Sequence, residues 1–240
     1  SVDDATRLIS ISAVQYADGL RMDLPRIGEF CRDRGILFCV DAIQQLSALP
    51  FDVAGIGADF VVADGHKWLL APEGLALFYC RREHLERLAL HQFGWHMVAE
   101  RGDYERLDWQ PAADAQRFEC GSPNMLGIHA LSASLSLLEE VTLPVVAANI
   151  GQHVTRLADG LARRGDVDLL TPADPARRAG ILTFRPHRGT PEALHRTLGE
   201  AGVVCAARGG GVRFSPHFWH ADDDIDTALE HLDAALAGLS

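Results

Sequence analysis

The sequence predicts an α/β protein with a mostly parallel sheet, followed by a small α+β domain at the C-terminal end. Two observations support this prediction. Short apolar runs alternate with amphipathic stretches through the first part of the chain, which is the pattern of βαβ units. Further along, the pattern changes to short strands and single helices, which is typical of helices packed on one face of a sheet. We therefore divide the chain into residues 1–145 and residues 146–240.

The first part of the chain supplies the strands of the expected sheet. Apolar runs at 7–14, 36–41 and 58–64 are interpreted as buried strands, and 24–35 as the helix between the first two. Residues 74–80 follow the third run too closely for a helical crossover, so we expect them to form an antiparallel neighbour. Ligands bind beyond the carboxyl ends of the strands in such sheets, so polar residues there are candidates for a site.

The middle of the chain loses this regularity. Residues 88–117 are polar and aromatic without periodicity, and we interpret them as a long functional loop. Helices are expected at 125–141 and at about 145–164. The small domain then shows strand-like runs at 167–170, 180–186, 202–207 and 211–216, and helices at 191–201 and 222–238.

Composition excludes several classes of partner. The chain has 240 residues, 48% of them hydrophobic, and a net charge of −11, which argues against a nucleic-acid or anionic-membrane partner. No apolar run approaches the ~20 residues that a bilayer requires. The cysteines are odd in number and widely spaced, so we expect reduced thiols in a cytoplasmic protein without a metal site. They are Cys31, Cys39, Cys80, Cys120 and Cys205.

Lys67 follows one of the expected buried strands. Asp64 and Gly65 predict a turn there, and His66 and Trp68 flank the lysine with groups that can hydrogen-bond or cover its amine. One interpretation is a solvated surface lysine without a catalytic role. The other is a partly desolvated amine, which loses its proton more readily and can form a Schiff base with an aldehyde.

Asp41 ends the preceding buried strand, 26 residues before Lys67, and Gln44 follows it on the next turn. Asp41 is either the N-cap of a helix or a carboxylate that keeps a pyridine-type nitrogen protonated, which makes the ring an electron sink. Gln44 is either a surface amide or a donor to the phenolate oxygen of the same ring. Both side chains are therefore candidates for the cofactor site.

Three motifs in this order resemble the class V aminotransferase family of pyridoxal 5'-phosphate enzymes, and the resemblance runs through nearly all of the sequence. This family includes cysteine desulfurases, selenocysteine lyases and isopenicillin-N-epimerase-like proteins. The resemblance implies the large cofactor-binding domain of fold type I, with pyridoxal 5'-phosphate as cofactor. The motifs are "FCVDAIQQLSALPFDVAGIGADFVVADGHKWLLAPEGLALFYC", "ECGSPNMLGIHAL" and "GGGVRFSPHFWHADDDID".

The resemblance also assigns roles to individual residues. It implies that Lys67 forms the Schiff base, Asp41 pairs with the pyridine nitrogen, and Gln44 contacts the ring oxygen. It further implies that His66 helps to hold the phosphate and that Ser122 reaches the phosphate of a partner subunit's cofactor. The family is thus expected to make this protein a homodimer with shared active sites.

The family's carboxylate-binding arginine corresponds to Arg213, whose planar fork suits a bidentate pair with an amino-acid substrate. The alternatives from the sequence alone are that Arg213 is an exposed strand residue and that Ser122 begins a turn ahead of a helix. Because the three motifs occur in the same order as in the family, we favour the functional interpretation of both residues.

Four departures from the family pattern limit what the resemblance implies. The chain begins after the family's phosphate-binding turn and cofactor-stacking ring, so we expect the large domain to be incomplete at its N-terminus. Asp64 puts a carboxylate where it would repel a phosphate unless it points away. Tyr16 stands where several desulfurases carry Asn. Cys205 is expected within a strand, as an inert buried thiol.

We therefore predict a pyridoxal-phosphate-dependent enzyme that acts on an amino acid as an aminotransferase, epimerase or lyase of the class V type. The sequence around Cys205 favours the epimerase-like and aminotransferase-like branches. Two alternatives remain: a non-catalytic or truncated dimerising domain of the same fold, and a cysteine desulfurase or C–S lyase.

Overall fold

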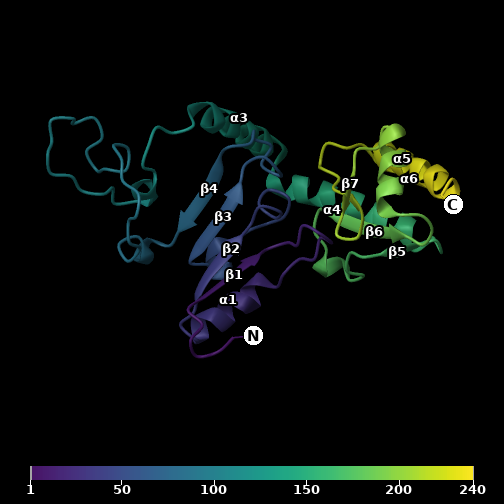
Figure 1. Cartoon of the computed structure of the whole chain (residues 1–240), viewed down its shortest axis with the longest axis horizontal. Helices are drawn as coiled ribbons and strands as arrows, with labels where there is room; N and C mark the ends of the chain where they lie inside the picture. Colours follow the sequence, from purple (N-terminus) through teal and green to yellow (C-terminus); the bar gives the residue numbers. More distant parts are fainter. Residues whose placement is uncertain (1, 240) are drawn as a thin grey trace. The chain divides into compact units, whose positions relative to one another are not determined.

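Four strands form the sheet on which the candidate site is built (Figure 1). The computed structural model describes residues 2–239, and these strands lie in the order β1-β2-β3-β4. β2 and β3 are parallel, whereas β3 and β4 are antiparallel. The strands are β1 (Leu8–Ser12), β2 (Leu37–Asp41), β3 (Phe60–Asp64) and β4 (Ala76–Cys80). The predicted α/β class is confirmed, and so is the antiparallel pairing of the strand expected at 74–80.

Two helices connect the first three strands. α1 (Leu24–Asp33) follows β1, and α2 (Val53–Ile56) follows β2. The two helices approach closely, because a Cβ atom at Gly28 would lie only 1.9 Å from the carbonyl oxygen of Ile56. A side chain at position 28 would therefore push α1 away from α2. Under this contact, Phe38 of β2 is fully buried.

Helix α3 (Met125–Val141) begins and ends where the sequence predicts. Asn124 caps it, because its Oδ1 accepts a hydrogen bond from the Gly127 N–H at 3.0 Å. The Nδ2 of the same side chain donates to the Gly74 carbonyl at 3.0 Å. Asn124 thus fastens the start of α3 to the segment that leads into β4.

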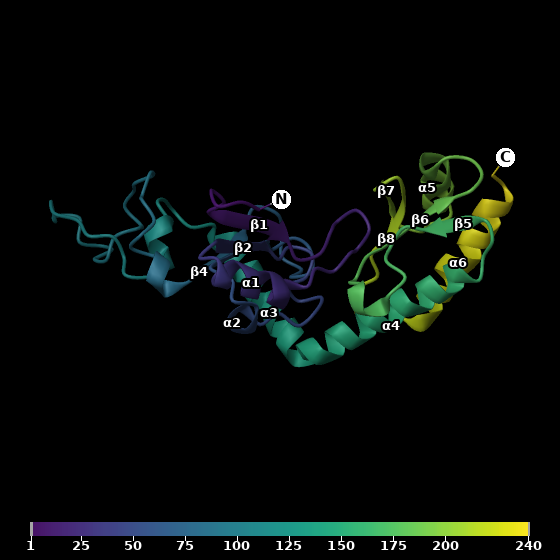
Figure 2. The same cartoon turned by 90° about the horizontal axis from the view of Figure 1, so that it is seen from below.

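The second sheet has the order β5-β6-β8-β7, and all of its neighbouring strands are antiparallel (Figure 2). Phe184 and Phe214 pack their rings at 5.2 Å, on the opposite face from Thr183. α4 packs on α6, and α5 packs on β6, β7 and β8. The elements are α4 (Leu143–Ala162), β5 (Val167–Leu169), β6 (Leu182–Pro186), α5 (Pro191–Glu200), β7 (Ala206–Arg208), β8 (Gly211–Phe214) and α6 (Asp222–Ala237).

The strand expected at 202–207 forms only from Ala206 onward. The Val203 N–H still bonds back to Leu198 in α5, at 2.8 Å, and Val204 is 99% exposed. The apolar run thus serves as the exit from a helix before it becomes a strand, so Cys205 directly precedes β7 and does not lie within it.

The long segment at 88–117 contains no α-helix or strand, as expected for a loop. It is crossed by one isolated bridge between Val98 and Pro111 and ends in the 3-10 helix Ala115–Phe118. Its aromatic side chains include Tyr104, which is 78% exposed.

The chain forms two compact units, which are described separately. One combines residues up to 11 with 24–43 and 52–135, and the other combines 12–23 and 44–51 with residues from 136 onward. Between residues 2 and 239, no single helix is long and apolar enough to cross a membrane. The consecutive helices α3 and α4, which are separated by a bend, are long and apolar enough for a membrane span only when they are counted as one helix.

Candidate active site

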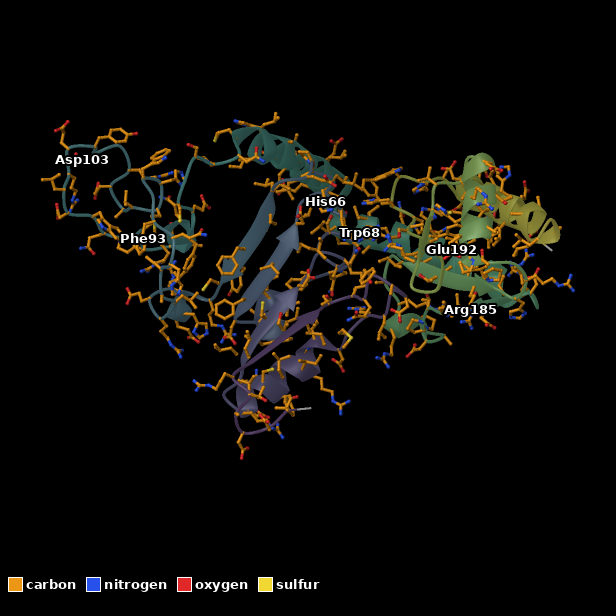
Figure 3. The ribbon with its side chains drawn as sticks, viewed as in Figure 1. His66, Trp68, Phe93, Asp103, Arg185 and Glu192 are labelled. Carbon is orange, nitrogen blue, oxygen red and sulfur yellow. The ribbon has the colours of Figure 1, made fainter. Side chains whose placement is uncertain are left out.

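Lys67 lies in the segment that connects β3 to β4, between His66 and Trp68 in the sequence. Figure 3 labels these two neighbours. The Gly65 N–H donates to the Leu75 carbonyl at 2.9 Å, and the Gly65 carbonyl accepts from the Ala71 N–H at 2.9 Å. These bonds close the turn into a loop. Trp68 is only 5% exposed and anchors the loop in the core, whereas Lys67 is half-buried.

The backbone of this loop is strained at Leu70, whose φ is +62°. A non-glycine residue in that region costs on the order of 1–3 kcal/mol and persists only where its surroundings hold it. Here the Leu70 N–H donates to the Lys67 carbonyl at 3.1 Å, and the Leu70 carbonyl accepts from Ser134 Oγ in α3 at 3.0 Å. Strain of this kind is typical of ligand-binding sites, where it fixes the direction of a side chain.

Lys67 is the only lysine in the sequence. The chain has 22 basic residues, and the other 21 are arginines. An arginine supplies the same charge but cannot act as an amine nucleophile toward an aldehyde. Lys67 therefore supplies the only side-chain amine of the sequence. Residue counting alone could have revealed this feature.

Asp41 ends β2 at the same edge of the sheet as the lysine loop. Asp41 pairs with Val62 in the parallel register, so β3 runs two residues further to Asp64 before the loop begins. The Oδ1 of Asp41 accepts from the Ile43 N–H at 3.0 Å. A turn follows and no helix, so the helix N-cap interpretation is wrong.

His66 and Asp64 form a pair just before Lys67, where Figure 3 labels His66. The Nδ1 atom of His66 lies 2.7 Å from Oδ1 of Asp64. The hydrogen bond from His66 holds the pKa of the Asp64 carboxyl below its ordinary value. Asp64 therefore turns toward the histidine, and its carboxylate orients the imidazole ring as a partner does in a histidine–carboxylate pair.

Gln44 and Ser122 differ sharply in burial. Gln44 is 5% exposed, so the surface-amide interpretation is wrong and its amide lies in the interior. Ser122 is exposed in the segment that leads into α3, three residues before the helix starts at Met125. Its side chain is therefore accessible to a molecule outside the chain.

Arg213 projects from β8 and is held by a loop from the N-terminal part of the chain. Its Nη1 donates to the Tyr16 carbonyl at 2.8 Å. Thr183 Oγ1 and Thr171 Oγ1 hold the same loop by donating to the Ala17 carbonyl at 2.6 Å and the Asp18 carbonyl at 2.7 Å. The Nε of Arg213 is buried without a hydrogen-bond partner.

The structure brings some of the predicted site residues into one unit. Asp41, His66, Lys67 and Ser122 belong to the unit that contains the first sheet, whereas Gln44 and Arg213 belong to the other unit. Within the first unit, the shared carboxyl edge of β2 and β3 joins Asp41 to the lysine loop. The Tyr16 carbonyl that holds Arg213 was not predicted, because a backbone contact across almost 200 residues leaves no mark in the sequence.

Burial raises the pKa of the Cys205 thiol to about 11. None of the five cysteines forms a disulfide. His195 Nε2 lies 3.2 Å from the Cys205 carbonyl, which fixes the backbone there. A thiol with so high a pKa is almost entirely protonated near neutrality, which makes Cys205 a poor nucleophile.

We expect alkylation of Cys205 by iodoacetamide at pH 8 to be about 200-fold slower than that of an ordinary exposed cysteine, because only about 0.1% of the thiol is ionised. The rate should rise tenfold per pH unit up to about pH 11. Mass spectrometry of peptides alkylated across this pH range measures it, with the urea-unfolded chain as control. A rate that levels off near pH 8 would contradict the assigned environment.

Solved structures define the class of protein to which this fold belongs. The apo structure of a cysteine desulfurase from Thermococcus onnurineus NA1 matches with a TM-score of 0.88, at 23% identity, over 98% of this chain and 61% of that one. A mutant of C-DES with glycine covalently linked to its PLP cofactor matches with a TM-score of 0.87, at 23% identity, over 100% and 62%. The fold is that of the fold-type-I pyridoxal-phosphate enzymes.

The chain belongs to the Aminotransferase class-V family, which matches residues 1–223. The uncharacterized aminotransferase YcbU of Bacillus subtilis is 30% identical over 97% of this chain and 60% of its own length. Isopenicillin N epimerase of Streptomyces clavuligerus is 31% identical over 95% of this chain and 60% of its own. A probable cysteine desulfurase of Methanothermobacter thermautotrophicus is 30% identical over 100% and 62%. This chain thus spans about 60% of the length of these curated relatives.

Proposed function

We propose that this chain belongs to a pyridoxal-phosphate-dependent enzyme that acts on an amino acid, with Lys67 attaching the cofactor through a Schiff base. One observation carries the proposal. The only lysine of the sequence lies half-buried in a strained loop at the carboxyl edge of the first sheet. That position offers one amine in a fixed direction, which is what covalent capture of an aldehyde requires.

The residues present fit this cofactor. Asp41 supplies a carboxylate at the end of the neighbouring strand, and His66 supplies an imidazole backed by Asp64. Gln44 supplies a buried amide, which is suited to a ring oxygen. In our proposal Asp41 faces the ring nitrogen, His66 the phosphate, and Ser122 the phosphate of a partner subunit's cofactor.

When bound, pyridoxal 5'-phosphate supplies a ring that accepts electrons from the Cα of an amino acid. Asp41 keeps a proton on the ring nitrogen, because a nearby carboxylate favours the charged form of a base. The Lys67 amine moves a proton to or from Cα once it is released. Arg213 binds the substrate carboxylate through two parallel N–H donors, one of them the Nε that lacks a partner within the described chain.

Among reactions of this type, we propose transamination, epimerisation or lyase chemistry without a persulfide on the protein. The raised pKa of Cys205 supports this choice, because persulfide formation needs a thiolate nucleophile. Relatives named as cysteine desulfurases make cysteine desulfuration the competing reaction.

An assay with cysteine, alanine and other amino acids distinguishes these reactions. Transamination, α-proton exchange and sulfide release would be followed in parallel on protein loaded with pyridoxal 5'-phosphate. We expect amino-acid turnover that is largely unchanged in Cys205→Ser. Rapid sulfide release from cysteine that disappears in Cys205→Ser would establish the desulfurase reaction, and no turnover of any amino acid would favour a non-catalytic domain.

We also propose that the protein is a homodimer in which α3 takes part in the interface. Three apolar side chains just after Ser122 support this: Met125 is 53% exposed, Leu126 81% and Ile128 41%. We expect Leu126→Glu to weaken the dimer at least tenfold, because it places a charge in a desolvated contact, as measured by sedimentation equilibrium. The control is Val204→Glu, which changes another exposed residue in the second sheet's unit. An unchanged oligomeric state in Leu126→Glu would contradict this interface.

A further inference from the structure

The β7–β8 hairpin presents two arginines on one face. Ala206 pairs with Arg213 and Arg208 pairs with Gly211, so the register is fixed. Residues that pair directly share a face, and so do residues two apart on one strand. Arg208 and Arg213 therefore project on the same side of the hairpin as diagonal neighbours. The Cα atoms of such neighbours typically lie about 7–8 Å apart.

The turn between these strands leaves no freedom in that register. Gly209 and Gly210 have φ values of 62° and 76°, as the central residues of a two-residue hairpin turn require. A Cβ atom at Gly209 would lie 2.7 Å from the Ala17 carbonyl, so the turn packs directly under the loop that holds Arg213. A slip of one residue between β7 and β8 would place the two arginines on opposite faces and break this contact.

No carboxylate neutralises this pair in residues 2–239. Some other arginines of the same unit do have acidic partners: Arg156 pairs with Asp226 and Arg185 with Asp168. Burial lowers the pKa of Arg213, and the nearby charge of Arg208 lowers it further. Two like charges are thus held together in a chain whose net charge is −11. An anionic ligand would relieve their repulsion.

The guanidinium of Arg213 is held in place before an anion binds, whereas the exposed side chain of Arg208 can adjust its position to the ligand. The Tyr16 carbonyl holds Nη1 of Arg213, while its Nε is buried without a partner. The side chain of Arg208 is exposed. The first guanidinium is therefore preorganised and the second adaptable, an arrangement that suits one fixed anionic group and a second at variable distance.

We propose that Arg208 binds a second anionic group, so that the site prefers amino acids with an acidic side chain over neutral ones of the same shape. This inference rests on the proposed function, because it assigns the α-carboxylate to Arg213. It adds the substrate class: an α-amino acid that carries a second carboxylate.

The test compares ligands that differ in charge and not in shape. On protein loaded with pyridoxal 5'-phosphate, L-glutamate and L-glutamine are titrated against the visible spectrum. On protein without the cofactor, glutarate and its monoamide are compared by calorimetry. We expect the dianionic ligand to bind about fivefold more tightly in both experiments, as one exposed ion pair allows. Arg208→Gln should reduce this ratio to about one, and Arg208→Lys should retain part of it.

The matched control is Arg188→Gln, which removes one exposed positive charge elsewhere in the same unit and should leave the ratio intact. Equal binding of both ligands to the unaltered protein would overturn the proposal, as would a ratio that survives Arg208→Gln or is lost in Arg188→Gln. The calorimetric arm needs no cofactor chemistry. A glutarate preference without any spectral change on adding pyridoxal phosphate would therefore reject the proposed function and leave the role of Arg208 standing.

Discussion

Lys67→Arg is expected to abolish covalent attachment of pyridoxal 5'-phosphate, and with it all turnover of amino acids. The substitution keeps the positive charge and much of the side-chain length, but a guanidinium has no amine that forms a Schiff base. The sequence contains no second lysine that could take over this role. The visible absorbance band that forms on adding the cofactor to the unaltered protein should be absent. Because covalent steps of this kind lie at the centre of catalysis, we expect activity to fall by at least about 1,000-fold.

Two controls separate loss of chemistry from loss of fold. Far-ultraviolet circular dichroism should be unchanged in Lys67→Arg, because Trp68 and the Gly65 hydrogen bonds hold the loop in place. Lys67→Ala should give the same loss of absorbance. A visible band of normal intensity in either folded variant would show that the cofactor is held in another way.

Arg213→Lys is expected to weaken amino-acid binding by about 30-fold while leaving cofactor attachment intact. Lysine keeps the charge but replaces the planar fork by a single ammonium group, so one of two charge-assisted bonds, contributing about 1.5–3 kcal/mol, is lost. It also removes the Nη1 donor that bonds to the Tyr16 carbonyl, which loosens the loop. Titration of the cofactor spectrum with an amino acid and with its decarboxylated amine measures the effect.

In that experiment the amino acid should lose affinity, whereas the amine, which lacks the carboxylate, should bind both proteins alike. Arg196→Lys makes the same change at an exposed position of α5 and should alter neither ligand. Equal weakening of amino acid and amine in Arg213→Lys would assign Arg213 a structural role only.

The sequence predicted the elements that rest on local pattern. α3 was predicted at its observed bounds because its apolar run is long, and the structure adds Asn124 as its cap. The antiparallel pairing of β3 and β4 was predicted because the strand expected at 74–80 follows the one expected at 58–64 too closely for a helical crossover. The order of the three family motifs predicted the family itself.

Features that depend on tertiary contacts were not predictable from local pattern. Asp41 was weighed as an N-cap because it follows a strand, but a turn without a helix follows it. Gln44 is hydrophilic, yet its segment associates with the second unit, where it is buried. The strand at β7 begins later than its apolar run suggests, because pairing with β8 reaches only Ala206. The Tyr16 carbonyl and Arg213 are 197 residues apart.

The central claim is that Lys67 carries the cofactor, and borohydride reduction followed by peptide mapping tests it most directly. The protein is loaded with pyridoxal 5'-phosphate, reduced so that the Schiff base becomes a stable secondary amine, digested, and analysed by mass spectrometry. The sequence offers a single lysine amine for this reaction. We predict stoichiometric phosphopyridoxyl modification of the peptide that contains Lys67 and none in Lys67→Arg. Modification confined to peptides that lack Lys67, or no modification of any peptide, would contradict the account.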